Sequence, residues 1–386
     1  MLKTKGVCMQ KIFRTGLEAA LILAVGMGFG RFAFTAIYPY MVEEQILSVQ
    51  SGSLAASANY IGYLIGALLA IRFRMKHAHH VAMTALIGTT FCLGMQALPL
   101  PDGGFIALRG LAGVFSAWAI VGASQWLLGQ KGLLKAAPLL YAGVGLGIAL
   151  SAELVVLGAA WQWSSRQLWL LLAVFAFFIS LFVIPKLRTA NFLPPHTHTA
   201  NADEPPALRA LPLIVLYGLA GFGYIITATY LPLLVKLVLP DLAVGHIWAV
   251  FGLGAIPSCF IWHAVQQRHH AQYALACNLG LQAVGVVLPV WLPNAAGYLL
   301  SALLVGATFM GTVTLVMPLA QRIARHTGGN LIAVLTAAYS IGQILGPLTA
   351  NEFYRHSHSF NPSLITAALA LLLAAALSFT LTSKES

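Results

Sequence analysis

Residues 26–39 read GMGFGRFAFTAIYP and place an arginine, Arg31, near the middle of a long apolar run. The glycines do not match the dinucleotide-binding pattern G-x-G-x-x-G, because Arg31 stands where the third glycine would be. An arginine at the centre of a membrane helix costs about 2.5–3.5 kcal/mol on translocon-derived scales. The stretch therefore predicts a membrane helix whose buried charge has a specific partner.

The composition of the whole chain is that of an integral membrane protein. Of its 386 residues, 59% are hydrophobic and 8% are charged, and the mean hydropathy is +0.84. The apolar runs are twenty residues or more long without in/out alternation, which favours helices over a β-barrel. We expect an all-α protein with 12 transmembrane helices at 14–41, 51–71, 80–100, 104–129, 133–158, 167–185, 210–236, 241–263, 272–292, 295–321, 330–354 and 360–382. The first run is too long for a signal peptide and lacks an A-x-A cleavage site, so we expect it to be retained.

The net charge of +11 follows the loops of this topology, so it does not indicate a nucleic-acid partner. With a cytoplasmic N-terminus, only Arg166, Lys236 and Arg355 fall on the outer side, and most other Lys and Arg fall inside. The positive-inside rule then predicts a multi-pass inner-membrane protein in a lipid bilayer, with both termini cytoplasmic. The four cysteines show no C-x-x-C spacing and none lies in an outer loop, so a disulfide framework is not expected.

A long polar stretch at 186–209, KLRTANFLPPHTHTANADEPPALR, divides the chain into an N-terminal six-helix bundle, 1–185, and a C-terminal one, 210–386. Similar residues recur across this cytoplasmic linker. An offset of about 193 places Gly28-Phe-Gly30 and Pro39 on Gly221-Phe-Gly223 and Pro232, and Gly113 on Gly306. An offset of about 199 places Gly143, Gly147 and Glu153 on Gly342, Gly346 and Glu352. We infer two pseudo-symmetric halves with a ligand site between them near the membrane midplane.

Three stretches resemble the YbfB/YjiJ branch of the major facilitator superfamily (MFS): GMGFGRFAFTAIYPYM, SGSLAASANYIGYLIGALLA and YAGVGLGIALS. The resemblance implies secondary transport in the inner membrane, but it implies no particular substrate. The loop GALLAIRFRMK lacks the aspartate that the superfamily usually carries there. The sequence from Arg109 to Gly113 is similar to the superfamily's arginine-and-glycine motif linked to proton coupling, with Ala112 in place of the usual glutamine. The fifth span lacks the G-P pair of drug/proton antiporters.

Arg31 is the main candidate for substrate binding. At 3.6 residues per turn its face of the helix also carries Gly28, Thr35 and Tyr38, while Phe29 and Phe32 lie off that face, turned toward lipid or packing. One interpretation is that Arg31 faces a central cavity and binds an anionic group, typically a carboxylate. The other is that Arg31 pairs with a glutamate or with backbone carbonyls and fixes helix packing. The aligned residue of the second half, Tyr224, would make the cavity asymmetric.

Further polar residues fall inside the predicted spans. Asn59 and Tyr63 share a helix face and could hydrogen-bond either a ligand or a neighbouring helix, and Gln125 and Gln343 are weaker candidates of the same kind. Three residues are candidates for proton coupling: Arg109, Glu153 and Glu352. Arg109 is close enough to a span end to reach the interface, and packing within its motif is the alternative to a proton-coupling role. Glu153 is either a buried proton carrier or an interfacial carboxylate, and for Glu352, beside Arg355 and His356, the interface is favoured.

The remaining patterns indicate no enzyme. The histidine clusters lie mostly in loops without a defined ligand set, so no metal site is expected. No catalytic triad or Walker motif is present, so we expect no catalytic residue, no cofactor and no use of ATP. The leading hypothesis is a monomeric, proton-coupled secondary transporter of a small organic anion or polar metabolite. The alternative is a proton-coupled exporter of amphipathic compounds, using aromatics such as Trp118, Trp126, Tyr141 and Tyr339. A membrane sensor or enzyme is a remote alternative.

Overall fold

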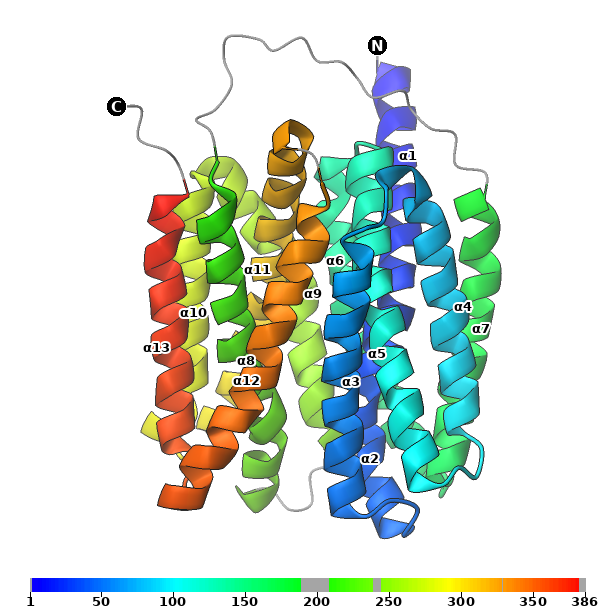
Figure 1. Cartoon of the computed structure of the whole chain (residues 1–386), viewed down its shortest axis with the longest axis vertical. Helices are drawn as coiled ribbons and strands as arrows, with labels where there is room; N and C mark the ends of the chain where they lie inside the picture. Colours follow the sequence, from blue (N-terminus) through cyan, green and yellow to red (C-terminus); the bar gives the residue numbers. More distant parts are fainter. Residues whose placement is uncertain (1, 189–207, 239–243, 328, 382–386) are drawn as a thin grey trace.

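The computed structural model describes residues 2–188, 208–238, 244–327 and 329–381. Its regular elements are helical, so the predicted all-α fold is confirmed, and the helices stand side by side in one bundle (Figure 1). The α-helices are α1 Leu2–Leu23, α2 Ala33–Glu43, α3 Val49–Ala70, α4 Ala78–Gln96, α5 Asp102–Ser124, α6 Ala137–Ala160, α7 Ser165–Arg188, α8 Ala210–Val238, α9 Val244–Arg268, α10 Ala271–Trp291, α11 Ala295–Thr327, α12 Leu331–Ser357 and α13 Asn361–Leu377. Short π- or 3₁₀-helices are η1 Ala24–Phe32, η2 Met75–His77, η3 Gln125–Gln130, η4 Leu134–Ala136 and η5 Ser378–Thr380.

Within the described residues, eleven helical segments are long and apolar enough to cross a membrane. The helix α4, with polar His79, His80 and Gln96 among its 19 residues, is not one of them by composition. It nevertheless packs in the bundle against α5 and α7, so it completes the twelve expected spans. Large apolar side chains such as Phe178, Leu181 and Leu369 are exposed on the helices, as expected of surfaces that face lipid.

The first span departs from the single regular helix that the sequence predicts. The helices α1 and α2 are joined without a break by the π-helix η1, which contains Arg31. Hydrogen bonds in a π-helix run from residue i to i+5, so the turn is wider than the α-helical turn. The assignment of Arg31, Gly28, Thr35 and Tyr38 to one face assumed 3.6 residues per turn. That spacing holds in α2, which contains Thr35 and Tyr38, but not between Gly28 and Arg31, which both lie in η1.

The two groups of helices meet along two helix pairs. We call α1–α7 the N-half and α8–α13 the C-half. Most helices pack with members of their own half. The extensive contacts between the halves run between α6 and α9 and between α3 and α12. Figure 1 shows α3 and α12 side by side at the front of the bundle. The boundaries 1–185 and 210–386 remain a prediction, because most of the predicted linker lies outside the described residues.

Glycines allow the closest helix crossings. A Cβ atom on Gly28 would lie 2.4 Å from the Cα of Gly147, and a Cβ atom on Gly143 would lie 2.1 Å from the carbonyl oxygen of Ala20. Such distances are far below van der Waals contact, so only glycine fits at these positions. The small-residue stripe of α6 therefore does serve close helix packing, and it holds η1 against α6.

Equivalent glycines of the proposed repeat make equivalent contacts. A Cβ atom on Gly113 in α5 would lie 2.2 Å from the carbonyl oxygen of Asn59 in α3. A Cβ atom on Gly306 in α11 would lie 2.4 Å from the carbonyl oxygen of Phe251 in α9. In the first contact the fourth span packs on the second, and in the other the tenth span packs on the eighth. The packing therefore has the symmetry that the sequence offset indicated.

The start of α1 and the end of α13 lie at the same end of the bundle, which we call the terminal end (Figure 1). The other is the opposite end. At the terminal end α12 begins at an N-cap, Asn330, whose side-chain oxygen accepts a hydrogen bond from the backbone N–H of Ala333 at 3.1 Å. The residue before it, Gly329, has a φ of 79°, a left-handed conformation that glycine adopts without strain.

Candidate functional site

Arg31 lies inside the bundle, with 3% of its surface exposed. Its Nη2 donates a hydrogen bond of 2.5 Å to Oε1 of Gln343 in α12. Its guanidinium carbon lies 4.0 Å from the ring centre of Tyr63 and 5.3 Å from that of Tyr60, both in α3. Aromatic faces attract a desolvated cation, so these rings stabilise the buried charge in part.

A hydrogen-bond chain continues from Arg31 into the C-half. The side-chain Nε2 of Gln343 donates to the hydroxyl of Tyr224 in α8 at 2.6 Å. Tyr224 is the residue that the internal repeat aligns with Arg31, so the two equivalent positions meet through one glutamine. The structure thus brings together four of the predicted substrate-binding residues, Arg31, Tyr63, Tyr224 and Gln343, from four different helices.

Arg31 has no acidic partner among the described residues, where no carboxylate lies within ion-pair distance of its guanidinium. Its Nε and Nη1 atoms are buried without a hydrogen-bond partner. The one buried acidic side chain in the described part of the chain, Glu18, instead pairs with Arg14 at 3.4 Å and Lys186 at 3.7 Å. A buried charge without a partner costs several kcal/mol, and an anionic ligand would offset this cost.

Arg109 is a second buried cation close to Arg31. Its guanidinium donates to the backbone carbonyls of Gly30 at 2.9 Å and of Arg31 at 3.1 Å, and it lies 4.5 Å from the ring centre of Phe34. Only 1% of its surface is exposed, so the expectation that it could reach the interface is wrong. The physical reason is that π-helical carbonyls draw the side chain inward. Arg109 therefore fixes the backbone that presents Arg31, and it adds positive charge to the same region.

Aromatic side chains lie beside Arg31. We call them the aromatic wall: Phe32, Tyr224, Trp248, Phe251, Phe309 and Tyr339. The ring of Phe309 stacks on that of Tyr224, with 4.5 Å between ring centres. The rings of Phe309 and Phe32 form a T-shaped pair with 6.2 Å between their centres. The ring of Phe32 also lies 5.6 Å from the guanidinium carbon of Arg31. Anions with an apolar body would find both polar and aromatic contacts here.

The structure decides between the two alternatives for Phe29 and Phe32, which were lipid and packing. Phe29 and Phe32 are buried, with 0% and 8% of their surface exposed, and Phe32 contacts the C-half rings of Trp248 and Phe309. Neither faces lipid, so the packing alternative describes the position of both rings.

Other predicted substrate-binding residues lie away from the guanidinium. Tyr38 stacks on Phe34 at 5.3 Å between ring centres and packs against Gly52, and Thr35 is half-buried in α2. Asn59 donates to the backbone carbonyl of Arg109 at 3.0 Å, so it joins α3 to α5. Gln125 is buried in η3.

Of the four aromatic residues predicted for an exporter cavity, some contact other groups of the protein and one belongs to the aromatic wall. Trp118 donates to the carbonyl of Gly66 at 3.1 Å, and Tyr141 shares a hydrogen bond of 2.9 Å with Ser124. Trp126 is fully buried within the N-half. Of the four, Tyr339 belongs to the aromatic wall, with its ring 5.5 Å from that of Tyr224.

The two predicted proton-coupling glutamates lie at the opposite end of the bundle. The carboxylate of Glu153 in α6 lies 2.9 Å from Nδ1 of His246 in α9, and half of the Glu153 side chain (50%) is exposed. This contact bridges the two halves. Because the carboxylate is exposed, the interfacial interpretation of Glu153 describes its position and the buried one does not.

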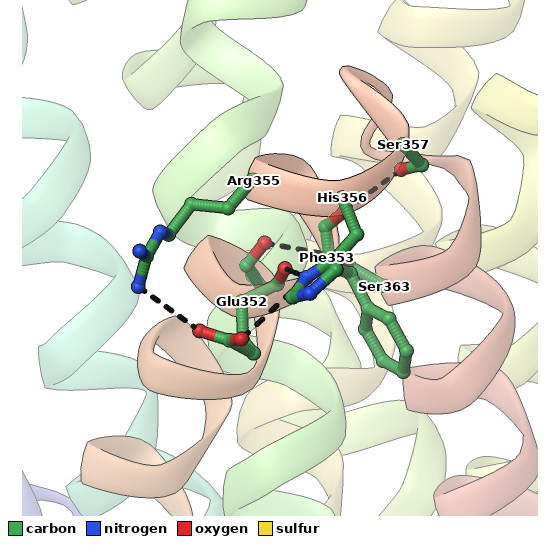
Figure 2. Close-up of polar contacts among 7 residues, drawn as sticks. Glu352, Phe353, Arg355, His356, Ser357 and Ser363 are labelled. Carbon is green, nitrogen blue, oxygen red and sulfur yellow. Dashed lines mark hydrogen bonds and ion pairs between the residues drawn. The ribbon is translucent and has the colours of Figure 1, made fainter.

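Glu352 is 60% exposed and interacts only locally in α12. Its carboxylate lies 3.5 Å from Arg355 and 3.5 Å from His356, and Figure 2 shows these side chains turned toward one another on the last turns of the helix. Exposed pairs of this kind contribute little to stability. Its surroundings are those of the interface, as expected.

The halves also meet at the terminal end. Nδ2 of Asn330 in α12 donates to the backbone carbonyl of Ala70 at the end of α3, at 2.6 Å. Together with the Glu153–His246 contact, this hydrogen bond joins the halves on both sides of Arg31. Arg31 is therefore enclosed. No group of three or more His, Cys, Asp or Glu side chains in the described chain is placed to hold a metal ion.

Sequence reasoning missed most of the aromatic wall and the contacts through which Arg109 packs on η1. Phe309 and Phe251 have no polar group, and the indole N–H of Trp248 does not distinguish it from a packing residue, so their place depends on how α9 and α11 pack. The supporting role of Arg109 depends on the π-helix, which the sequence did not predict. The signal that did work was the deep position of Arg31 and the repeat alignment with Tyr224.

Twelve helices in two packed halves, with a buried polar site between them, define a multi-pass membrane transporter of the MFS type. The chain belongs to the family described as uncharacterised MFS-type transporter YbfB, whose match covers residues 23–379. The suspected branch of the superfamily is thus confirmed. A search of the curated proteins finds no match.

Proposed function

We propose that the protein is a secondary transporter of small organic anions and that Arg31 binds their anionic group. The observation that carries this proposal is a guanidinium that is 3% exposed, with two nitrogens lacking a partner and no carboxylate within ion-pair distance in the described chain. Arginine suits carboxylate recognition because its planar donors match the geometry of the anion. Arg109, 3.1 Å from the carbonyl of Arg31, adds to the attraction.

The aromatic wall narrows the substrate to anions with an apolar or aromatic body. Tyr224, Phe309 and Phe32 surround the side of the site next to Arg31 and offer ring faces and edges. Such pockets orient a ligand with few polar groups and bury the rest of its surface in apolar contacts. A very polar metabolite would leave its hydroxyl groups unpaired against these rings.

In this proposal transport occurs by rocking of the N-half against the C-half around Arg31. The terminal end faces the cytoplasm, because the Lys and Arg of the loops gather there, and the membrane is the inner membrane. The Asn330–Ala70 hydrogen bond closes the cytoplasmic side, and the Glu153–His246 contact closes the outer side. Breaking one contact while keeping the other would expose Arg31 to one side at a time.

Proton coupling belongs to the same proposal, with Glu153 as the proton acceptor. Protonating Glu153 would remove its charge and weaken its contact with His246, so proton binding would favour opening of the outer side. Glu352 bridges no helices of different halves, and Arg109 is tied to two backbone carbonyls, so neither suits this role as well.

Export of amphipathic compounds is the second candidate, and the aromatic wall is the observation that favours it. Six rings in contact could bind neutral or cationic apolar compounds without using Arg31. A cationic compound would have to approach two buried guanidinium groups, whose repulsion opposes it. The sign of the charge on transported compounds separates the two candidates.

Purified protein in proteoliposomes would test the proposal. An imposed pH gradient should drive accumulation of radiolabelled aryl carboxylates, and a protonophore should abolish it. In Glu153→Gln, counterflow of the same carboxylate should persist while pH-driven accumulation is lost. If neutral and cationic amphipathic compounds are transported but carboxylates are not, the organic-anion proposal is refuted and the exporter moves ahead.

A further inference from the structure

A hollow lies at the terminal end, far from Arg31 along the bundle. Its volume is about 730 Å³. Residues from both halves line it: Lys135 in η4 of the N-half, the end of α9 and start of α10 around Arg268, and Arg322 near the end of α11. The hollow is large enough for a phosphate group together with part of the molecule that carries it.

Cationic side chains converge on this hollow. Lys135, Arg268 and Arg322 supply three positive charges, and His263, His269 and His270 add imidazole groups. Among the lining residues that the structure describes, none is Asp or Glu. Like charges that share a concave surface repel one another, so the closed arrangement carries an electrostatic cost that a bound anion would offset. The positive-inside rule accounts for basic loops, but it does not require three elements from both halves to aim them at one cavity.

His263 borders the hollow from α9. Its Nε2 lies 2.9 Å from the side-chain nitrogen of Gln267, another lining residue. The Nδ1 atom of His263 is buried, so it does not open onto the hollow. An anion in the hollow would therefore be held mainly by Lys135, Arg268 and Arg322.

We propose that this hollow is a binding site for a phosphate-bearing anion, supplied either by the headgroup of an anionic phospholipid or by a soluble phosphate compound. The ligand would join Lys135 of the N-half to Arg268 and Arg322 of the C-half. It would therefore hold the halves together at the terminal end, independently of any substrate at Arg31. Binding there stabilises the conformation in which this end is closed.

The test compares two charge-matched double variants with the wild type by thermal unfolding. R268Q/R322Q removes two lining charges, and R72Q/R74Q removes two exposed charges at the same end that do not line the hollow. In detergent the probe is sodium pyrophosphate against sodium chloride at equal ionic strength. In nanodiscs the probe is phosphatidylglycerol against phosphatidylcholine.

We expect the probe to raise the unfolding temperature of the wild type and of R72Q/R74Q. R268Q/R322Q should need at least a tenfold higher probe concentration for the same rise. A response to pyrophosphate indicates a soluble ligand, and a response to phosphatidylglycerol alone indicates the lipid headgroup. If R268Q/R322Q does not fold, Lys135→Gln takes its place with the same expectation. Equal responses in the lining and control variants, or no response to either probe in the wild type, would overturn the proposal.

Discussion

Replacing Asn330 by Asp should open the terminal end of the protein. The amide of Asn330 has two functions, because its oxygen caps α12 at the N–H of Ala333 and its nitrogen donates to the carbonyl of Ala70 in the other half. Aspartate is as good an N-cap as asparagine, so the helix keeps its start. A carboxylate has no N–H to donate, so the hydrogen bond of 2.6 Å between the halves is lost.

The size of the effect follows from that one hydrogen bond. A neutral hydrogen bond contributes about 0.5–1.5 kcal/mol net, and the new carboxylate also repels the Ala70 carbonyl. A loss of about 1 kcal/mol raises the population of molecules open at this end roughly fivefold. In Asn330→Ala the cap is lost as well, which costs about 1 kcal/mol more in the free energy of unfolding.

Labelling of a buried cysteine measures this population. Gln321 in α11 is 2% exposed, and its Nε2 lies 3.2 Å from the position that a Cβ atom on Gly129 of the N-half would take. Gln321→Cys, on a background without other reactive cysteines, should react with a soluble maleimide about five times faster when Asn330→Asp is added. The reaction requires exposure of the cysteine, so its rate follows the open fraction.

Asn351→Asp is the matched control, since it makes the same change on the same helix at the opposite end. Its oxygen Oδ1 accepts from the hydroxyl of Tyr230 at 2.9 Å, and a carboxylate keeps that acceptor. Labelling at position 321 should therefore not change. Equal labelling rates in Asn330→Asp and the parent would refute the reasoning that this hydrogen bond closes the terminal end.

Three further predictions concern helix packing, the buried charge and the exposed carboxylate. Gly28→Ala should lower the free energy of unfolding by about 1–3 kcal/mol, because its Cβ would lie 2.4 Å from backbone atoms of α6. Gly280→Ala, whose Cβ would have nothing within 4 Å, should be neutral or stabilising. Denaturant unfolding in detergent measures both, and equal stabilities would contradict the packing described. Tyr63→Leu should lower the free energy of unfolding by about 2 kcal/mol in the same assay, because it removes the ring 4.0 Å from the Arg31 guanidinium. Tyr63→Phe keeps the ring and should cost far less. Similar losses of stability in the two variants would exclude the cation–π contribution. Glu352→Gln should leave pH-driven transport in proteoliposomes unchanged, because that side chain is 60% exposed and bridges no helices; loss of coupling would restore Glu352 as the proton acceptor.

Most of the fold could be predicted because membrane spans depend on local composition. Twelve apolar runs predicted twelve helices, and α4, with polar residues such as His79, His80 and Gln96, is the one that composition alone does not identify. The π-helix η1 could not be predicted in this way. It depends on Gly28 fitting against Gly147 and on Arg109 satisfying the carbonyls of Gly30 and Arg31, both of which are tertiary contacts.

The site was predicted in outline and not in its details. A charge deep in an apolar run is costly wherever the helix packs, so Arg31 was visible from the sequence. Which side chains surround it depends on the crossing of α3, α8 and α12, so Gln343 and Tyr224 could only be proposed as candidates. Glu153 shows the limit most clearly, because sequence could not distinguish a buried carboxylate from the exposed pair with His246.

The central claim is that Arg31 binds the anionic group of the substrate, and ligand-induced thermal stabilisation tests it most directly. Small carboxylates would be screened against purified wild type, each beside its uncharged amide, as with phenylacetate and phenylacetamide. A ligand at 100 times its Kd stabilises the folded state by about 2.7 kcal/mol, which is easily measured.

Arg31→Gln and Arg31→Lys complete the measurement, since the first removes the charge and the second keeps it without the planar donors. The account predicts that carboxylates, and not their amides, raise the unfolding temperature of the wild type, that Arg31→Lys responds weakly, and that Arg31→Gln does not respond. Stabilisation of Arg31→Gln by the same carboxylates, or equal stabilisation of the wild type by acids and amides, would contradict it.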